Sequence, residues 1–145
     1  MREMASPLVQ LVQQGYEAWN SGDRGWVLEH MSADVEWVTP TDDPDPGVYR
    51  GHRGVEEYWA QWRAAVGQLS FSIEEMIDAG DSVVVVAKRQ GRGEHSGLEV
   101  SDHVIQVFEF EGDQCVRVRE YYDRDSALSS VQDAVKAADR ARESR

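Results

Sequence analysis

The stretch that decides the fold is "VFEFEGDQCVRVREYYD", residues 107–123. Apolar and polar side chains alternate on both sides of "EGDQ", which is the pattern of two β-strands joined by a tight turn. Successive side chains of a strand point to opposite faces of the sheet. In the second strand one face carries Val116, Val118, Glu120 and Tyr122, and the other carries Arg117, Arg119, Tyr121 and Asp123. The first face begins as core and then meets a carboxylate, so Glu120 is the first candidate for a functional group.

Helix and strand signals on either side place this hairpin in a larger sheet. Apolar side chains at three- and four-residue spacing predict helices over 7–20, 54–66 and 126–142. Asp23 suits the N-cap of a short helix that runs through His30. Strands are predicted over 34–39, 69–78, 83–93, 97–111 and 115–123. The proline-rich stretch "PTDDPDPGVYRG", residues 40–51, predicts a loop.

This order of elements predicts an α+β domain with helices on one face of a curved antiparallel sheet. The other face of such a sheet is usually polar. Here the runs 83–86 and 104–110 are apolar on both faces of their strands. We therefore expect a second copy of the chain to cover the outer face and form a homodimer through the sheet.

Composition narrows the choice of partners and compartment. The chain has 145 residues, one cysteine and a formal net charge of −12. Such acidity opposes binding to nucleic acid and to anionic membrane surfaces. No apolar run has membrane-spanning length and no signal peptide is evident, so we expect a cytoplasmic protein. A single cysteine, Cys115, excludes an internal disulfide framework, and we expect its thiol to be inert.

Four stretches resemble the nuclear transport factor 2-like superfamily and, within it, the SnoaL-like branch. They are "YEAWNSGDRGWVLEHMSADVEWVTP", "VYRGHRGVEEYWAQW", "GDSVVVVAKRQGRGEHSG" and "VFEFEGDQCVRVREYYD". The resemblance covers about residues 8–128 and implies a cone, in which a strongly bent sheet wraps around the N-terminal helices and leaves a deep pocket. It divides the chain into a cone domain over 1–128 and a C-terminal helical extension of the same domain over 129–145. The fold serves isomerases, epoxide hydrolases, dehydratases, polyketide cyclases and non-catalytic binding domains, so it does not fix the function.

The resemblance extends in part to ketosteroid isomerases. These enzymes use a tyrosine on the first helix, a general-base aspartate at the end of the first strand, and a protonated aspartic acid on a later strand. Tyr16 matches the tyrosine, whereas the two acids fall at Thr39 and near Gln106. Steroid-type isomerisation is therefore not expected.

Limonene-type epoxide hydrolases are also similar. They use an Asp-Arg-Asp set that activates water, and their last-strand motif resembles "VREYYD". That match places Glu120 on the catalytic carboxylate and Arg89 on the arginine, while the other aspartate falls at Gly91. The resemblance implies an Arg89–Glu120 pair without the second carboxylate.

SnoaL-like cyclases use an aspartate and a histidine, for which Asp102 and His103 are candidates by type. Neighbouring residues of a strand face opposite sides, so only one of them can reach the pocket. Asp102 shares a strand face with Gln106, Phe108 and Phe110, which are expected to point into the cone, so Asp102 is predicted to be the inward one. His103 then serves as a base only if a bulge shifts the register, and otherwise lies at an edge or in a dimer contact.

Each candidate also has a structural interpretation. Glu120 is either a general acid or base, or one half of an ion pair with Arg89 that closes the pocket floor. The aromatic side chains are either core or walls of a ligand site, with Tyr16, Trp37 and Trp59 the expected pocket members.

The remaining polar clusters predict no cofactor or metal. His52 is expected in the turn before the third helix, and His30 and His95 receive no role. The aspartates of residues 42–45 lack the spacing of a calcium loop, and no zinc or nucleotide motif occurs.

The sequence thus predicts a protein that binds a small, mainly apolar organic molecule in a cone. The expected catalytic residues are Glu120, Arg89 and Asp102, and the expected ligand-binding residues are Tyr16, Trp37, Trp59, Gln106 and Tyr122. If it is an enzyme, the reaction is cofactor-independent acid–base chemistry: isomerisation, cyclisation, dehydration or hydrolysis. The alternative is a non-catalytic ligand-binding domain, or a protein-interaction domain whose own aromatic side chains fill the cone.

Overall fold

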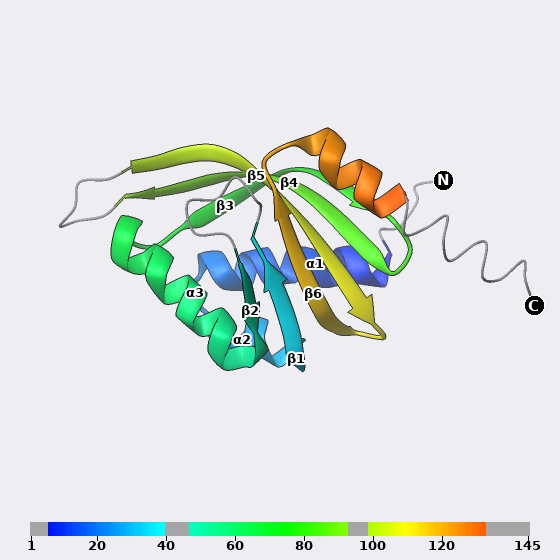
Figure 1. Ribbon diagram of the computed structural model, residues 1–145, viewed down its shortest axis with the longest axis horizontal. Helices are drawn as coiled ribbons and strands as arrows, with labels where there is room; N and C mark the ends of the chain where they lie inside the picture. The colour runs from blue at the N-terminus through cyan, green and yellow to red at the C-terminus, as the bar shows by residue number, and fades with distance from the viewer. Residues whose placement is uncertain (1–5, 40–46, 93–98, 133–145) are drawn as a thin grey trace, which may run out of the picture.

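The computed structural model describes residues 6–39, 47–92 and 99–132 (Figure 1). Three helices are α1 (Pro7–Asn20), α2 (Arg24–Glu29) and α3 (Gly51–Val66). Six strands are β1 (Met31–Val38), β2 (Val48–Arg50), β3 (Ser70–Asp78), β4 (Ser82–Arg92), β5 (Glu99–Glu111) and β6 (Gln114–Tyr121). A last helix runs over 124–132. No helix in these described ranges is long and apolar enough to cross a membrane.

The first two helices begin where the sequence predicts. The Ser6 side chain accepts a hydrogen bond from the backbone N–H of Val9, and Pro7 stands at the first helical position, where its missing N–H costs nothing. Asp23 caps α2 by accepting from the N–H of Trp26 at 3.1 Å. The predicted helix over 7–20 and the predicted N-cap are therefore confirmed.

The third helix begins earlier than predicted, at Gly51 instead of residue 54. Gly51 has a φ of +70°, a conformation that glycine adopts without strain, and this lets the chain turn directly from β2 into α3. The expectation that His52 lies in a turn before the helix is therefore wrong. His52 belongs to the first helical turn, and its Nε2 lies 2.9 Å from the carbonyl oxygen of Met31.

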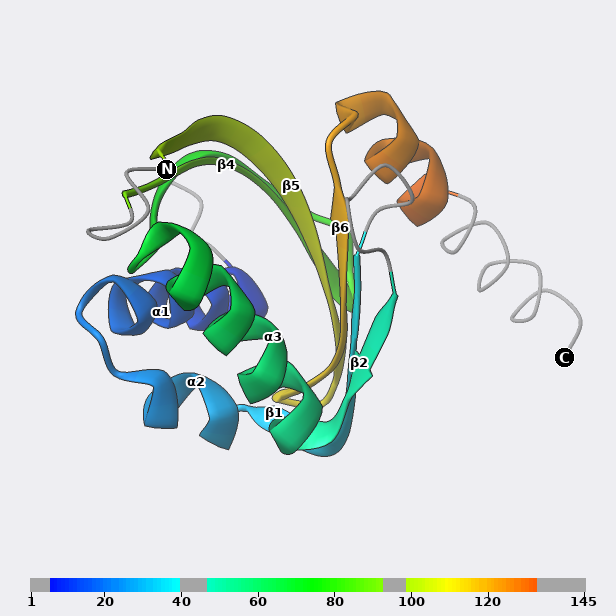
Figure 2. The same cartoon turned by 60° about the vertical axis from the view of Figure 1, so that its left-hand side comes forward.

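The six strands form one strongly curved sheet in the order β2-β1-β6-β5-β4-β3 (Figures 1 and 2). The predicted antiparallel ladders β3–β4–β5–β6 are confirmed. Two features were not predicted: β1 pairs with β6 in parallel, and the three-residue β2 lies within the stretch predicted as a loop. The parallel pair brings the first strand beside the last, which places Trp37 next to Val118 and close to Glu120.

The main core lies between the concave face of the sheet and helices α1, α2 and α3, which Figure 2 shows inside the curve. Val83, Val85 and Ala87 of β4 point to this side, together with Val118 of β6. Because side chains alternate along each strand, the same register carries Gln106 of β5 and Glu120 of β6 inward. The α+β cone with helices inside a curved sheet is confirmed.

The apolar outer face has a cover within the chain itself. The helix over 124–132 packs on the convex side, where Ala127 and Val131 are buried against Val84, Ile105 and Val107. Residue 128, the predicted end of the cone domain, falls inside this helix, and residues 133–142 of the predicted helix lie outside the described ranges. The apolar outer positions that motivated a homodimer are thus at least partly accounted for by the last helix.

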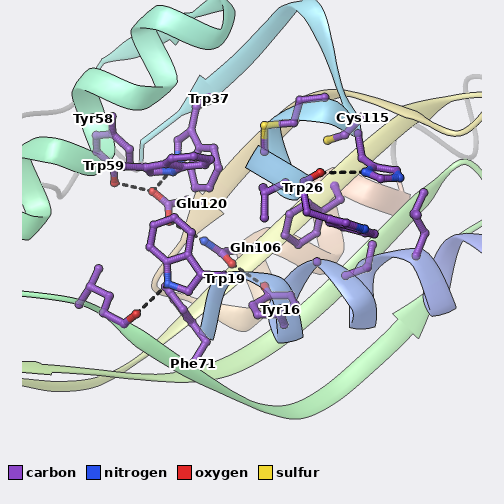
Figure 3. A pocket seen from close by; sticks show the side chains of 18 of the residues that line it. Tyr16, Trp19, Trp26, Trp37, Tyr58, Trp59, Phe71, Gln106, Cys115 and Glu120 are labelled. Carbon is purple, nitrogen blue, oxygen red and sulfur yellow. Dashed lines mark hydrogen bonds between the residues drawn. The ribbon is translucent and has the colours of Figure 1, made fainter. Parts of the chain in front are cut away.

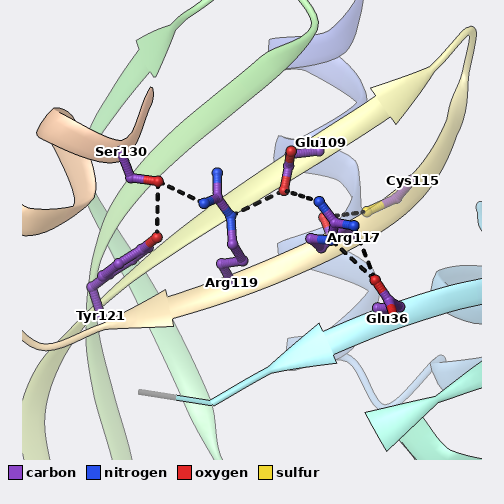
Figure 4. Close-up of polar contacts among 7 residues, drawn as sticks. All are labelled: Glu36, Glu109, Cys115, Arg117, Arg119, Tyr121 and Ser130. Carbon is purple, nitrogen blue, oxygen red and sulfur yellow. Dashed lines mark hydrogen bonds and ion pairs between the residues drawn. The ribbon is translucent and has the colours of Figure 1, made fainter. Parts of the chain in front are cut away.

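Another part of the outer face carries a ladder of ion pairs (Figure 4). Glu109 lies 3.0 Å from Nε of Arg119 and 3.7 Å from Nη1 of Arg117, and Arg117 also pairs with Glu36 at 3.0 Å. Arg119 donates to the Ser130 hydroxyl at 2.6 Å, which links the ladder to the last helix. The outward direction predicted for Arg117 and Arg119 is confirmed.

The cover formed by the last helix can be tested with Val131→Asp. The new carboxylate would be buried against the apolar outer face without a partner, so the free energy of unfolding should fall by about 2 kcal/mol or more. Urea denaturation measures this change. Gln132→Asp adds the same charge at an exposed neighbouring position and should change stability by less than about 0.5 kcal/mol. Equal effects of the two substitutions would show that the helix does not pack on the sheet.

Candidate functional site

A cavity of about 100 Å³ lies between the concave face and the helices, several times the roughly 10–15 Å³ that one water molecule needs. Its wall is mainly aromatic. Ten phenylalanine, tyrosine and tryptophan side chains line it, among them all five tryptophans of the chain: Trp19, Trp26, Trp37, Trp59 and Trp62. The aromatic side chains therefore surround a space and do not fill it completely.

Glu120 is the carboxylate of this cavity, and it is 5% exposed (Figure 3). Its Oε1 accepts from Nε1 of Trp37 at 2.9 Å and from the hydroxyl of Tyr58 at 2.6 Å. Its Oε2 accepts from Nε2 of Gln106 at 2.9 Å. Indole and amide N–H groups only donate, so the carboxylate acts here as an acceptor with both of its oxygens. The predicted inward direction of Glu120 is confirmed.

The hydrogen-bond chain continues from Glu120 to the first helix. Gln106 uses its amide nitrogen for Glu120, and its carbonyl oxygen accepts from the hydroxyl of Tyr16. Burial, followed by the nearby charge of Glu120, raises the pKa of the Tyr16 phenol well above its ordinary value. Tyr16 therefore stays neutral and remains a donor over the physiological pH range.

These contacts fix the carboxylate from four separate elements. Trp37 comes from β1, Tyr58 from α3 and Gln106 from β5, while Tyr16 of α1 supports Gln106 from behind. Side chains held in this way keep one orientation without a ligand, which is the condition for a preorganised site.

The predicted Arg89–Glu120 pair is not what the structure contains. Arg89 instead makes a two-pronged ion pair with Asp102, with Nε 3.0 Å from Oδ1 and Nη2 2.8 Å from Oδ2. The reason is register: Arg89 and Asp102 are direct partners in the β4–β5 ladder, whereas Glu120 faces Gln106 across β5–β6. A planar guanidinium fork matches a facing carboxylate in both direction and spacing.

Arg89 remains part of the cavity wall although Asp102 holds it. It is 3% exposed, and its guanidinium carbon lies 4.5 Å from the ring centre of Trp62 and 5.8 Å from that of Tyr122. Burial lowers the pKa of Arg89, but hydrogen bonds with Asp102 and Tyr122 and the charges of Asp102 and Glu120 outweigh it and raise the pKa. The guanidinium therefore stays charged.

The predicted inward direction of Asp102 is confirmed, because Asp102 meets Arg89 on the inner side of the sheet. His103 points to the other side, where its Nε2 lies 2.7 Å from Oε1 of Glu74. The Asp102 side chain is 42% exposed, so it stands at the rim. Asp102 and Tyr122 both contact Arg89 and are not among the residues that line the cavity. These positions support an indirect role, through Arg89, in place of the catalytic role predicted for Asp102 and the ligand contact predicted for Tyr122.

The other predicted site residues come together as expected. Tyr16, Trp37, Trp59, Gln106, Arg89 and Glu120 all line the cavity. Tyr58 is one of the aromatic side chains that the sequence leaves as either core or pocket wall, and the sequence signal for it is its place on the apolar face of α3 beside Trp59.

His30 is a further polar residue of the lining, one to which the sequence assigned no role. Its Nδ1 lies 2.8 Å from the carbonyl oxygen of Trp26, and its ring stacks on the Trp26 indole with 3.9 Å between centroids. A carbonyl only accepts, so Nδ1 carries the proton and Nε2 is the basic nitrogen. His30 stands at the end of α2, and nothing in the sequence distinguishes it from an ordinary histidine at a helix end.

Gly91 and Thr39 stand where the sequence resemblance would place further acids, and neither lines the cavity. A side chain at Gly91 would place its Cβ 2.8 Å from Cδ2 of Leu69 and 3.2 Å from the carbonyl oxygen of Val66, so no carboxylate fits without movement. Thr39 is buried and exchanges hydrogen bonds with the backbone of Gly47 outside the cavity lining. Glu120 is thus the one carboxylate that lines the described cavity.

The cavity lining also contains the thiol of Cys115. Burial raises the pKa of the Cys115 thiol to about 12, so this lining residue stays a protonated thiol at neutral pH. Within residues 6–39, 47–92 and 99–132, no group of three or more His, Cys, Asp or Glu side chains could hold a metal ion.

Comparison with known proteins agrees with the fold expected from the sequence. Residues 12–118 match the sequence profile of the SnoaL-like domain. No curated protein matches the chain. Similar solved structures share 18–23% identity, a level at which the likeness concerns the fold.

Three of these structures contain small molecules. TerC, crystallised with polyporic acid, is 23% identical with a TM-score of 0.71, and the match covers 88% of this chain and 99% of TerC. A Mycobacterium tuberculosis protein in complex with estradiol-17β-hemisuccinate is 18% identical with a TM-score of 0.69, over 83% of this chain and 97% of that one. A Catenulispora acidiphila protein with a ketosteroid isomerase-like fold, in complex with trimethylamine, is 18% identical with a TM-score of 0.68, over 86% and 92%.

The hydrogen bonds of the cavity floor can be tested with Tyr58→Phe. This change removes one donor from a buried carboxylate, and the free energy of unfolding should fall by about 1.5–3 kcal/mol. The matched control is Tyr49→Phe, because the Tyr49 hydroxyl makes a 3.3 Å bond to Gln61 at an exposed site. It should cost less than about 0.5 kcal/mol. If urea denaturation gave equal losses for the two variants, Tyr58 would not hold Glu120.

Proposed function

Because the chain belongs to the SnoaL-like domain family, we propose that it binds a small, mainly apolar organic molecule in the cavity, with one end of the molecule against Glu120. The observation that carries this proposal is the carboxylate held by three hydrogen bonds on the wall of a cavity of about 100 Å³. A structural ion pair would need no such space beside it.

The lining suits this kind of ligand. Binding sites for small molecules are mostly apolar and aromatic, with a few fixed polar groups that orient the ligand. Here Tyr16, Trp37 and Trp59 supply aromatic surface, and Gln106 and Glu120 supply the polar end. The same lining disfavours the alternative of a protein-interaction domain whose cone is filled by its own side chains.

The complexes of similar fold support binding but not one ligand. Polyporic acid, a steroid hemisuccinate and trimethylamine differ widely in size and charge. The fold therefore accepts several ligand classes, and the choice among them must come from the side chains of this chain.

Proton transfer is the second candidate function, and Glu120 is the residue that favours it. A buried carboxylate in contact with a ligand can remove a proton from one atom and return it to another, which is the cofactor-independent acid–base chemistry expected from the sequence. Arg89 would contribute through its charge, since two nitrogens of its guanidinium already bind Asp102. Asp102 and Tyr122 would then position Arg89.

The homodimer that the sequence predicts remains a proposal. Since the last helix covers Val84, Ile105 and Val107, a dimer through this part of the sheet would have to displace that helix. The cytoplasmic location likewise stays a prediction from composition.

Ligand binding can be measured by tryptophan fluorescence, because all five tryptophans line the cavity. We expect saturable quenching by at least one member of a panel of steroids, epoxides, polyketide mimics, small aromatic acids and amines. Glu120→Gln keeps the shape of the side chain and removes its charge, so it should change the affinity for that compound by about tenfold. Glu56→Gln removes the same charge from an exposed position of α3 and should leave the affinity unchanged.

Two results separate the candidates. Turnover that is lost in Glu120→Gln while the ligand still binds would support proton transfer, whereas binding without turnover in the wild type would support a non-catalytic binding protein. No quenching by any compound would contradict the proposed function.

A further inference from the structure

The charges around the cavity do not balance. Arg89 and Glu120 line it, and Asp102 binds Arg89 at the rim. Two carboxylates therefore share one guanidinium, and an excess of one negative charge remains when all three are ionised. The second basic lining group is the imidazole of His30, which donates to a backbone carbonyl from another part of the wall.

Of the two carboxylates, Glu120 is the one that has no charged hydrogen-bond partner. All three of its hydrogen-bond partners, Trp37, Tyr58 and Gln106, are neutral. Arg89 gives Nε and Nη2 to Asp102, so its contribution to Glu120 is through space. A buried charge whose contacts are all neutral is the arrangement that a charged ligand can complete.

An anionic ligand fits these groups poorly. It would be the third negative group around one guanidinium, whose Nε and Nη2 already bind Asp102. Like charges brought together in an apolar space repel strongly, because little water screens them.

A cationic ligand fits them well. One positive charge would balance Glu120, and the ten aromatic rings of the wall offer faces that attract cations, tryptophan most strongly. The chain already uses this interaction at the cavity, where Arg89 lies 4.5 Å from the ring centre of Trp62. A formal net charge of −12 would also draw cations toward the protein.

We propose that the ligand of this cavity is an organic cation, an apolar body that carries a tertiary or quaternary ammonium group, with the ammonium group beside Glu120 and the aromatic wall. This inference rests on the proposed function and narrows it to one ligand class. Asp102 has a part in it, because it neutralises the guanidinium that would otherwise repel the cation.

The test compares three probes by isothermal titration calorimetry at pH 7, of which the cationic and the neutral one have nearly the same shape. They are phenols whose para substituent is trimethylammonium, tert-butyl or carboxylate, so the charge is positive, zero or negative. The wild type should bind the trimethylammonium compound at least tenfold more tightly than the tert-butyl compound, and the carboxylate compound most weakly. This comparison needs no variant and does not depend on how a substitution affects folding.

The Glu120→Gln variant tests whether the carboxylate of Glu120 causes the preference for the cation. It should remove the advantage of the cation and leave the affinity for the tert-butyl compound within about threefold, whereas Glu56→Gln should keep the full preference. The inference is overturned if the neutral or anionic probe binds the wild type as tightly as the cation, or if Glu120→Gln keeps the preference. If none of these probes binds and the compound that quenches the tryptophans is neutral or anionic, the inference falls and the proposed function stands. If no compound binds by either method, both fall.

Discussion

The structure depends on one buried carboxylate and the donors that hold it. Taking Glu120 out of water carries a penalty on the order of several kcal/mol, and only good hydrogen-bond geometry can offset it. Trp37, Tyr58 and Gln106 provide that geometry from β1, α3 and β5, which are far apart in the sequence. The same contacts hold the helices against the concave face of the sheet, so the cavity and the polar group on its wall depend on the same hydrogen bonds.

This arrangement explains why the cavity can serve a function without a large set of catalytic groups. A fixed carboxylate in an apolar surrounding acts more strongly on a ligand than one in water, because less water screens its charge. The neighbouring Arg89 and Asp102 neutralise each other's charge, which leaves Glu120 as the charged group that a ligand contacts. Packing leaves no room for a second acid at Gly91, since Leu69 and the backbone of Val66 occupy the space that a side chain there would need.

Much of the fold and part of the site follow from local rules that the sequence displays directly. Period-two alternation predicted that Glu120 and Asp102 point inward, and helical spacing together with the Asp23 cap predicted α1 and α2. What could not be predicted depends on which segments become neighbours. The partner of Arg89 follows from the β4–β5 register, the role of Tyr58 from the rotation of α3, and the cover of the outer face from the path of the last helix. Alternation gives the direction of a side chain but not the identity of the group opposite it.

The most direct test of this account is an NMR measurement on the indole N–H of Trp37, assigned with Trp37→Phe in protein labelled with ¹⁵N. The account predicts that this proton exchanges slowly with water, because it is buried and donates to Glu120. It also predicts that the signal shifts clearly in Glu120→Gln, while the indole signal of Trp19, which donates to the carbonyl of Leu69, shifts much less. Rapid exchange of the Trp37 proton, or a signal that does not respond to the loss of the carboxylate, would contradict the central role of Glu120.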